Sequence, residues 1–530
     1  MSGRHQTVAG AGRLIAISIC RDRIRIAIWV GAIVTMVWVS ALSIKGLFPT
    51  QAKLDAAAIA SSNPAVVAFN GPANALDTIG GEIVFQIGAP GLTTVGLMTL
   101  LMVLRLTRRE EESGRLELVR SLPVGRRAPL VAAGAVGFGA SIAAAVGSTV
   151  ALLATGQAAV GSIAFGLEVG VVGGVFTGIA LVAAQITENS RLASGMAGAA
   201  LAASFVIRAI GDMRDSWLSW LSPIGWAQQL RPFAGERWWT LALDAVAIAA
   251  LSAVAMVLLD RRDLGSGLIS SRPGPAVAGA DLGSPLALAF RLQRGSIIGW
   301  SMGIAAAGAT YGLITNAIAG FVRDNPDMAD FLASTGSASL IDSYLATSTH
   351  VTALIATAAA VQSILRLRSE ETAMRAEPLL ATAVSRSSWA WSYLWVALAT
   401  SVAVLAALGL GLGLSTAAVS GQWSIVGSVL IGSFIHLPAM GFAIGFALAL
   451  SGRLPNLAVG AWALVAGGLV VALFGPVLRL PRWTLDLSPF EHVPLFPAQS
   501  VRALPLVVLV LVGMVLAAIG IDGLRRRDIG

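Results

Sequence analysis

Long apolar stretches alternate with short polar segments along almost the whole chain. A helix needs about 20 mostly apolar residues to cross the hydrocarbon core of a membrane. The pattern predicts an all-α polytopic membrane protein with twelve spans. The predicted spans are 26–46, 83–104, 129–154, 161–186, 192–210, 239–259, 296–320, 349–366, 389–415, 423–450, 457–477 and 504–521.

The composition indicates that lipid is the solvent for much of the chain. Of the 530 residues, 56% are hydrophobic and only 12% are charged, whereas about 25% of the residues in a soluble domain are charged. The net charge of +8 lies in short arginine clusters between apolar stretches, so membrane topology explains it better than nucleic-acid binding. Cys20 is the sole cysteine, so we predict no intrachain disulfide and no cysteine-based metal site.

The arginine clusters predict the orientation of the spans. If the N-terminus is cytoplasmic, most basic residues fall in segments that face the cytoplasm, including the clusters at 105–127, 261–294 and 525–527. Cytoplasmic loops of membrane proteins carry an excess of Lys and Arg. We therefore expect a multi-pass chain in membrane lipid, with both termini in the cytoplasm.

The two halves of the chain repeat each other. Five short motifs recur in the same order at offsets of 260 to 271 residues. Each half ends in Arg-Arg-Asp, at 261–263 and 526–528. Because each half has an even number of spans, both halves face the same way, as in parallel-repeat transporters. We predict two six-span domains, 1–265 and 266–530, related as a tandem 6+6 parallel repeat.

Residues 107–127, which follow the second span, form a predicted amphipathic helix at the cytoplasmic surface. Leu116, Val119 and Pro123 lie on one face at helical spacing, and charged residues cover the rest. One interpretation is a helix that lies on anionic headgroups. A helix at a membrane surface prefers a predominantly basic polar face, but this segment contains several glutamates. A protein partner therefore explains its mixed charge better.

The charges of this segment are spaced for ion pairs along a helix. Glu111 and Arg115 are four residues apart, and so are Glu371 and Arg375 in the corresponding segment 368–386. Oppositely charged residues at this spacing are neighbours on a helix surface. We expect both pairs to form.

The order Arg109-Glu110-x3-Gly114-x2-Glu117-x5-Pro123, directly after the second of six spans, resembles the coupling-helix signature of type 2 ABC exporter permeases. The resemblance covers essentially the whole chain. The fused twelve-span form resembles the actinobacterial permeases that export polyketide antibiotics, the tetronasin-resistance type.

This resemblance implies the type 2 ABC exporter transmembrane fold. The family has an interfacial helix before the first span, matched here by 10–25, and partly re-entrant outer segments, matched by 212–237 and 478–502. The resemblance also implies a permease of the bacterial plasma membrane that extrudes hydrophobic or amphipathic drugs and antibiotics.

The resemblance assigns ATPase coupling to both halves. The residues it implies are Glu110, Glu111, Gly114, Arg115, Glu117, Pro123, Glu370, Glu371, Arg375 and Glu377. In the second half Met374 replaces the Gly, Ala383 replaces the Pro, and Pro378 is expected to interrupt the helix. We expect this second segment to dock differently or more weakly.

The sequence contains no ATP-binding loop of the Walker type, which requires G-x-x-x-x-G-K-[ST]. The only lysines, Lys45 and Lys53, do not occur in that context. The resemblance therefore implies two copies of a separate nucleotide-binding ATPase, which carry ATP and Mg, and a permease without catalytic residues. Their closure would move the membrane halves as rigid bodies.

A proton-coupled secondary multidrug transporter is the alternative. Such carriers often have two parallel halves, and they place ionisable residues inside the membrane. Glu168 and His436 are the clear interior cases. We favour a hydrogen-bonded structural role for each over a proton relay.

Two further sets of residues follow from the family's architecture. Residues implied to lie near the substrate path are Phe85, Gln86, Met98, Met196 and Phe205. Residues implied to form an outer gate are Trp217, Trp220, Pro223 and Trp226. Packing is the alternative for the first set, and anchoring at the membrane interface is the alternative for the second. An apolar path with few charges suggests a hydrophobic small-molecule substrate.

Overall fold

The computed structural model describes residues 7–61, 64–213, 215–263, 265–269, 277, 279, 282–324, 340–478 and 481–527. Within these ranges the regular structure is helical, and one isolated β-bridge joins Thr187 to Ile269. Twelve of the described helices are long and apolar enough to cross a membrane. The predicted all-α polytopic membrane protein is therefore confirmed.

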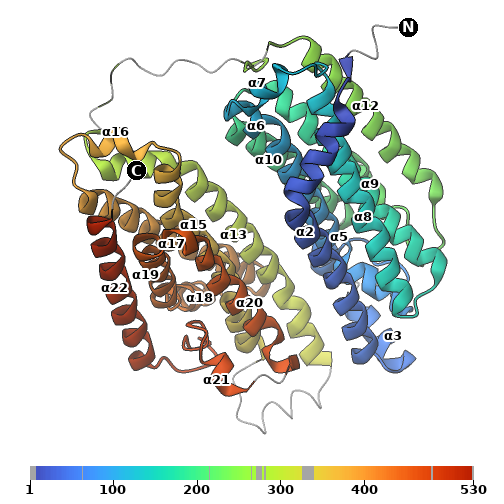
Figure 1. The fold of residues 1–530 in the computed structure, drawn as a ribbon. Coiled ribbons are helices and arrows are strands. Elements are labelled where there is room, and N and C mark those ends of the chain that lie inside the picture. Colours follow the sequence, from blue (N-terminus) through green and yellow to red (C-terminus); the bar gives the residue numbers. More distant parts are fainter. Residues whose placement is uncertain are drawn as a thin grey trace. The chain divides into compact units, whose positions relative to one another are not determined.

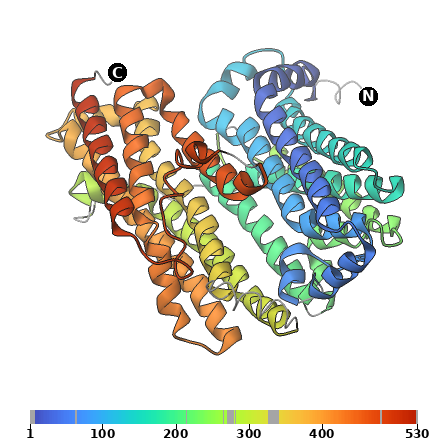
Figure 2. The same cartoon turned by 90° about the horizontal axis from the view of Figure 1, so that it is seen from below.

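The chain folds as two compact units, Met1–Gly274 and Pro275–Gly530. Each unit holds six of the candidate spans. Figure 1 colours the helices of the first unit from blue to green and those of the second from yellow-green to red. Figure 2 shows the same helices from below. In both units the long helices form a bundle, and each bundle is described on its own.

The helices of the first unit are α2 (Ala11–Leu47), α3 (Gln51–Ser61), α4 (Pro64–Asn70), α5 (Ile79–Leu104), η1 (Arg105–Arg109), α6 (Glu110–Glu112), α7 (Arg115–Arg120), α8 (Ala128–Ala154), α9 (Ala159–Ile186), α10 (Ser190–Met213), η2 (Trp217–Leu221), α11 (Pro223–Gln228), η3 (Trp238–Thr240) and α12 (Leu241–Asp260). The spans are α2, α5, α8, α9, α10 and α12.

Helix α9 lies at the centre of the first unit. It packs against α5, α8, α10 and α12, and the middle of both α9 and α5 is largely buried. Small residues permit this proximity, because a Cβ on Gly173 would lie 2.8 Å from Val95 of α5. Membrane helices commonly approach each other at small residues.

The helices of the second unit are α13 (Pro285–Asp324), α15 (Leu340–Thr372), α16 (Ala376–Leu380), α17 (Arg386–Ser420), α18 (Ile425–Phe434), α19 (Leu437–Arg453), η5 (Pro455–Gly460), α20 (Ala461–Leu478), α21 (Arg482–Leu485) and α22 (Ala503–Arg526).

Helices of the second unit pack against one another in the same pairs as their counterparts within the first unit. Helix α13 packs on α17 as α2 packs on α8, and α19 packs on α22 as α9 packs on α12. The contact between α19 and α22 depends on glycine, because a Cβ on Gly520 would lie 2.5 Å from the backbone of Leu448. The two sequences therefore fold into the same order of helix contacts.

The fourth span of the second unit is broken, whereas α9 of the first unit is continuous. Helix α18 ends at Phe434, and α19 begins at Leu437 with Pro438 in its first turn. Proline lacks an N–H and clashes with the preceding turn, so it is tolerated at the start of a helix but not inside one. His436 lies at this break.

The segments outside the membrane spans differ from expectation in one respect. Residues 11–25 are helical as predicted, but they continue into the first span as the single helix α2. The sequence from 11 to 47 contains no proline that would separate an interfacial helix from the span. The segment 212–237 contains η2 and α11, and 478–502 contains α21. Residues 479–480 of the second segment lie outside the described residues.

Candidate functional site

The candidate site consists of the two segments that connect the second span of each unit to the third. We term residues 105–127 linker 1 and residues 366–386 linker 2. In linker 1 the helix formed by η1 and α6 ends at Glu112, and α7 begins directly after Gly114, whose φ is 72°. A glycine in the left-handed conformation commonly ends a helix. The single helix predicted over 107–127 is therefore wrong.

Glu111 lies at the centre of a buried ion cluster in linker 1. Its carboxylate accepts hydrogen bonds from Arg262 at 2.8 and 3.0 Å, from Arg108 at 3.0 Å and from the Gly265 backbone N–H at 2.9 Å. The side chains of Glu111 and Arg262 are only 6% and 7% exposed. Since Arg262 directly follows α12, this Glu111 cluster joins the end of the second span to the end of the sixth.

The end of the fourth span belongs to the same cluster. Arg108 donates to the carbonyl of Ala184 and, at 3.1 Å, to that of Ser266. Arg262 donates to the side-chain oxygen of Gln185 at 2.7 Å. Ala184 and Gln185 lie in the last turn of α9. Three spans, α5, α9 and α12, therefore converge on Glu111 and its two arginines.

Linker 2 contains an equivalent cluster around Glu371. This glutamate pairs with Arg368 at 2.9 Å and with Arg527, which follows α22. Arg386 donates to the carbonyl of Arg527 at 2.6 Å, and its counterpart Arg126 donates at 2.7 Å to the carbonyl of the equivalent arginine in the first unit. The duplicated charges and the duplicated Arg-Arg-Asp ends therefore bind each other in both units.

The predicted i,i+4 ion pairs are wrong in both linkers. Arg115 pairs with Glu110 at 3.8 Å rather than with the following glutamate. Arg375 pairs with Glu370 at 2.5 Å, again rather than with the following glutamate. Spacing of four residues brings side chains together only on a continuous helix, and the helix ends before each arginine.

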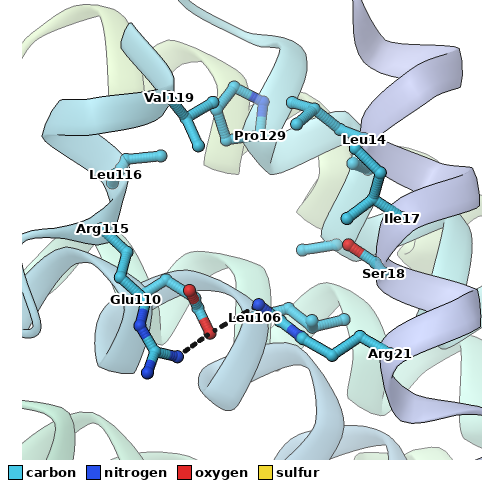
Figure 3. Close-up of a pocket in the computed structure, with 12 residues that line it drawn as sticks. Leu14, Ile17, Ser18, Arg21, Leu106, Glu110, Arg115, Leu116, Val119 and Pro129 are labelled. Atoms are coloured by element: carbon cyan, nitrogen blue, oxygen red, sulfur yellow. Dashed lines mark ion pairs between the residues drawn. The ribbon is translucent and has the colours of Figure 1, made fainter.

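The inner face of α7 packs against α2 and α8. Figure 3 shows Leu116 and Val119 of α7 opposite Leu14 and Ile17 of α2, across a cavity of about 90 Å³ that Pro129 also lines. Leu116 and Val119 share one face, as predicted, whereas Pro123, which was predicted on the same face, follows the end of α7 and is exposed. The cavity lies between the start of the first span and linker 1.

An ion pair closes one side of this cavity. Glu110 pairs with Arg21 of α2 at 3.1 Å and also with Arg115 (Figure 3). Arg21 is itself 3.7 Å from Asp22, which also pairs with Arg105 at 3.1 Å. These contacts connect α2 to linker 1.

The outer face of α7 is exposed. On α7, Leu118 is 73% exposed and Glu117 is also exposed; in the turn that follows α7, Leu122 is 60% exposed and Pro123 is exposed. Adjacent exposed apolar side chains mark interaction surfaces. Of the residues implied to couple, Glu117 and Pro123 are thus accessible to a partner, whereas Glu111 is occupied in its buried cluster.

Linker 2 follows the same backbone course with different residues. Met374 stands at the position of Gly114 and also adopts the left-handed conformation, with a φ of 56°. Pro378 lies in the first turn of α16, where the missing N–H costs no helical hydrogen bond. The expectation that Pro378 interrupts the helix is therefore wrong. Glu377, the counterpart of Glu117, is exposed.

Glu168 has no hydrogen-bonded structural role in the first unit. It is 1% exposed within α9, and neither carboxylate oxygen has a hydrogen-bond partner among the described residues. Asp244 of α12, a helix that packs against α9, is also fully buried, and its carboxylate has no hydrogen-bond partner among the described residues. The sequence reasoning missed Asp244, although an acidic residue inside the apolar stretch 239–259 was a visible signal.

His436 does have a hydrogen-bonded structural role. Its Nδ1 lies 2.9 Å from the Gly432 carbonyl, so Nδ1 must donate. Its Nε2 then accepts from Nδ1 of His350, at 3.2 Å. The sequence reasoning missed His350, because its partner in the broken fourth span is 86 residues away in the chain.

The residues proposed for the substrate path occupy different environments. Met98 is fully buried and Phe85 is 3% exposed, whereas Met196 is 41% exposed. Gln86 is exposed and donates to Glu82 at 2.8 Å. The ring of Phe205 lies under the guanidinium of Arg208, 4.6 Å from its centroid.

The residues proposed for the outer gate belong to an ordered aromatic cluster. Trp220 stacks on Trp239 with 5.7 Å between ring centroids, and Trp226 donates its indole N–H to the Trp220 carbonyl at 2.5 Å. Pro223 is the first residue of α11, and Trp217 is 68% exposed.

Comparison with known proteins identifies the family. Residues 282–525 match the family model of the multidrug efflux system permease Rv1217c, C-terminal domain. The chain is 37% identical over 520 residues to the multidrug efflux system permease protein Rv1217c of Mycobacterium tuberculosis, covering 97% of this chain and 94% of that protein. The chain belongs to the Rv1217c family of multidrug efflux permeases. The expected exporter-permease family is thus confirmed, and a permease is a membrane transport subunit rather than an enzyme.

The described residues of this permease contain no group of three or more His, Cys, Asp or Glu side chains that could hold a metal ion.

The Glu111 cluster predicts a large effect on stability. Replacing Glu111 with Ala leaves two buried guanidiniums without their carboxylate, and breaking a buried ion pair costs about 3–5 kcal/mol. The free energy of unfolding in detergent should fall by this amount. The matched control Glu117→Ala, at an exposed site, should change it by less than about 0.5 kcal/mol. Equal stabilities of the two variants would contradict the cluster's role.

The left-handed Met374 predicts a stabilising substitution. An L-residue in this conformation costs about 1–2 kcal/mol, and Met374 is 57% exposed, so its loss removes little packing. Met374→Gly should therefore be about 1 kcal/mol more stable than Met374→Ala in thermal or chemical unfolding. If the alanine variant proves the more stable, linker 2 does not turn at this residue as described.

Proposed function

We propose that this chain is the membrane permease of an ATP-driven exporter that extrudes hydrophobic or amphipathic drugs and antibiotics. ATP hydrolysis, with Mg, takes place on two copies of a separate ATPase subunit. The name of the relative supports multidrug efflux. The absence of a Walker-type loop from the sequence supports an energy source on another chain.

The observation that carries this proposal is the exposed surface formed by α7 and the turn that follows it. Leu118 and Leu122 offer apolar contact area, and Glu117 offers charge, to a protein partner. Behind this face, the Glu111 cluster holds the ends of α5, α9 and α12 together. A force applied to α7 would therefore move several spans together as a rigid body.

The arginine-rich end of each unit faces the cytoplasm in this proposal. Both linkers, with Arg262 and Arg527, lie at that end of their own bundles, as the excess of basic residues in cytoplasmic loops predicts. Both termini are then cytoplasmic, in the plasma membrane of a bacterium.

A pocket in the second unit supports a hydrophobic cargo. It has a volume of about 550 Å³, lies between α17, α19 and α22, and is lined almost entirely by apolar side chains, including Trp391, Trp395 and Met514. Trp391 and Trp395 stack with 6.3 Å between centroids. Pockets of this size and character suit drug-sized apolar molecules.

The test of the coupling assignment is charge reversal at Glu117. The chain and its ATPase would be reconstituted in liposomes, and cargo-stimulated ATP hydrolysis and dye export measured together. Glu117→Arg should reduce both by at least about tenfold, because a loss of 1.4 kcal/mol in a docking contact is tenfold in affinity. Asp77→Arg, an exposed carboxyl outside the linkers, is the matched control and should leave both unchanged. Normal export by Glu117→Arg would show that α7 is not part of the surface that docks the ATPase.

A further inference from the structure

A small polar cavity lies in the first unit, away from linker 1. Its lining includes Glu168 of α9, Gln228 of α11, Phe85 of α5, and Asn70 and Asn74 from the segment before α5. The cavity volume is about 20 Å³, and about 10–15 Å³ is enough for one water molecule. A drug-sized cargo is therefore excluded from it.

Two groups in this cavity lack partners. Both carboxylate oxygens of Glu168 and the side-chain oxygen of Gln228 have no hydrogen-bond partner among the described residues. Glu168 is 1% exposed and Gln228 is 7% exposed. The amide nitrogen of Gln228 donates to the Asn70 carbonyl at 3.3 Å, and Gln228 and Glu168 both line the cavity. Burying hydrogen-bond acceptors that receive no hydrogen bond is energetically unfavourable.

The charged groups that surround Glu168 do not neutralise it. The described helices α8 and α11 carry no ionisable side chain, and α9 carries none besides Glu168. Helix α12 contributes Asp244 and helix α5 contributes Glu82, which are carboxyls and cannot supply a positive charge. The one buried cation of α10, Arg208, donates instead to Asp212 and to carbonyls at the end of α4.

Among Glu168, Glu82 and Asp244, Glu168 has the fewest interactions that would stabilise a negative charge. Glu82 and Asp244 each lie in the first turn of their helices, where the positive end of the helix dipole stabilises a negative charge. Glu82 also accepts a hydrogen bond from Gln86. Glu168 lies in the third turn of α9, so it gains neither stabilisation by the helix dipole nor a hydrogen bond from another described side chain. An unpaired carboxylate at such a site takes up a proton rather than remain charged.

We propose that the cavity is a proton-binding site, in which Glu168 is protonated and donates its proton to the unpartnered oxygen of Gln228. One proton then gives a partner to both groups and removes the buried charge. The second unit has no such site, since the equivalent positions in the repeat are Phe434 and Leu509 in place of Glu168 and Asp244. The site concerns where a proton resides, so it does not depend on which energy source drives transport.

The test uses the full chain in lipid nanodiscs and infrared difference spectroscopy across a pH titration. The wild type should show the deuterium-sensitive carbonyl stretch of a protonated buried carboxyl at neutral pH, and Glu168→Gln should lose it. The matched control Asp77→Asn, which removes an exposed carboxyl, should retain it. A band that persists in Glu168→Gln, or is missing from the wild type, would overturn the assignment.

Thermal unfolding provides a second readout. The folded chain keeps a proton on Glu168 that the unfolded chain releases, so the stability of the wild type should fall as the pH rises. In Glu168→Gln this component of the fall should be absent. Identical pH profiles of the two proteins would count against the site. Stabilisation of the wild type but not of Glu168→Gln by NaCl, relative to choline chloride, would show a metal cation there instead.

A second variant keeps the proposal testable if Glu168→Gln does not fold. Asp244→Asn removes the neighbouring negative charge and makes ionisation of Glu168 easier, because like charges disfavour ionisation. The carbonyl band should then disappear at a lower pH than in the wild type. If the carbonyl band disappears at the same pH in Asp244→Asn and in the wild type, Asp244 does not influence Glu168. That result would contradict the proposed arrangement of the site.

Discussion

The arrangement of each unit depends on one buried glutamate held by two arginines. In the first unit Glu111 binds Arg108 from its own helix and Arg262 from beyond the last span. Removing charges from water is costly, and a buried ion pair rarely adds net stability compared with apolar packing. The main contribution of this cluster is therefore to hold helix ends in place rather than to add net stability. It fixes the ends of three spans relative to one another and leaves α7 as the projecting element.

A comparison of the two units shows which features of this arrangement are kept in both halves of the repeat. Glu371 makes the corresponding ion pairs with Arg368 and Arg527 in the second unit. The turn before α7 is also kept, even though Met374 must adopt a conformation that favours glycine. The ion cluster and the turn recur in both units, whereas the Gly and Pro of the motif do not. This suggests that linker 2 presents its exposed face in the same way as linker 1, with a weaker match in side chains.

The fold was largely predictable, because the length and periodicity of apolar stretches decide where a helix can cross a membrane. The partners of the charged residues were not. The sequence indicated that Glu111 and Glu371 matter, but the local spacing rule assigned them to Arg115 and Arg375, and the structure assigns them to arginines more than 150 residues away. The recurrence of Arg-Arg-Asp at both ends was the available signal. Likewise, the pairing of His350 with His436 becomes visible only when helices distant in sequence pack together, whereas Asp244 could have been noticed as an acidic residue within an apolar stretch.

The native composition of the complex tests the central claim most directly. The chain would be purified from its own membrane in mild detergent, and the mass and ATPase activity of the intact particle measured. The account predicts one copy of this chain with two copies of an ATPase that contains a Walker motif, and ATP hydrolysis that responds to hydrophobic cargo. A chain that is isolated alone, shows no ATPase activity and exports dye in vesicles on a proton gradient would contradict it.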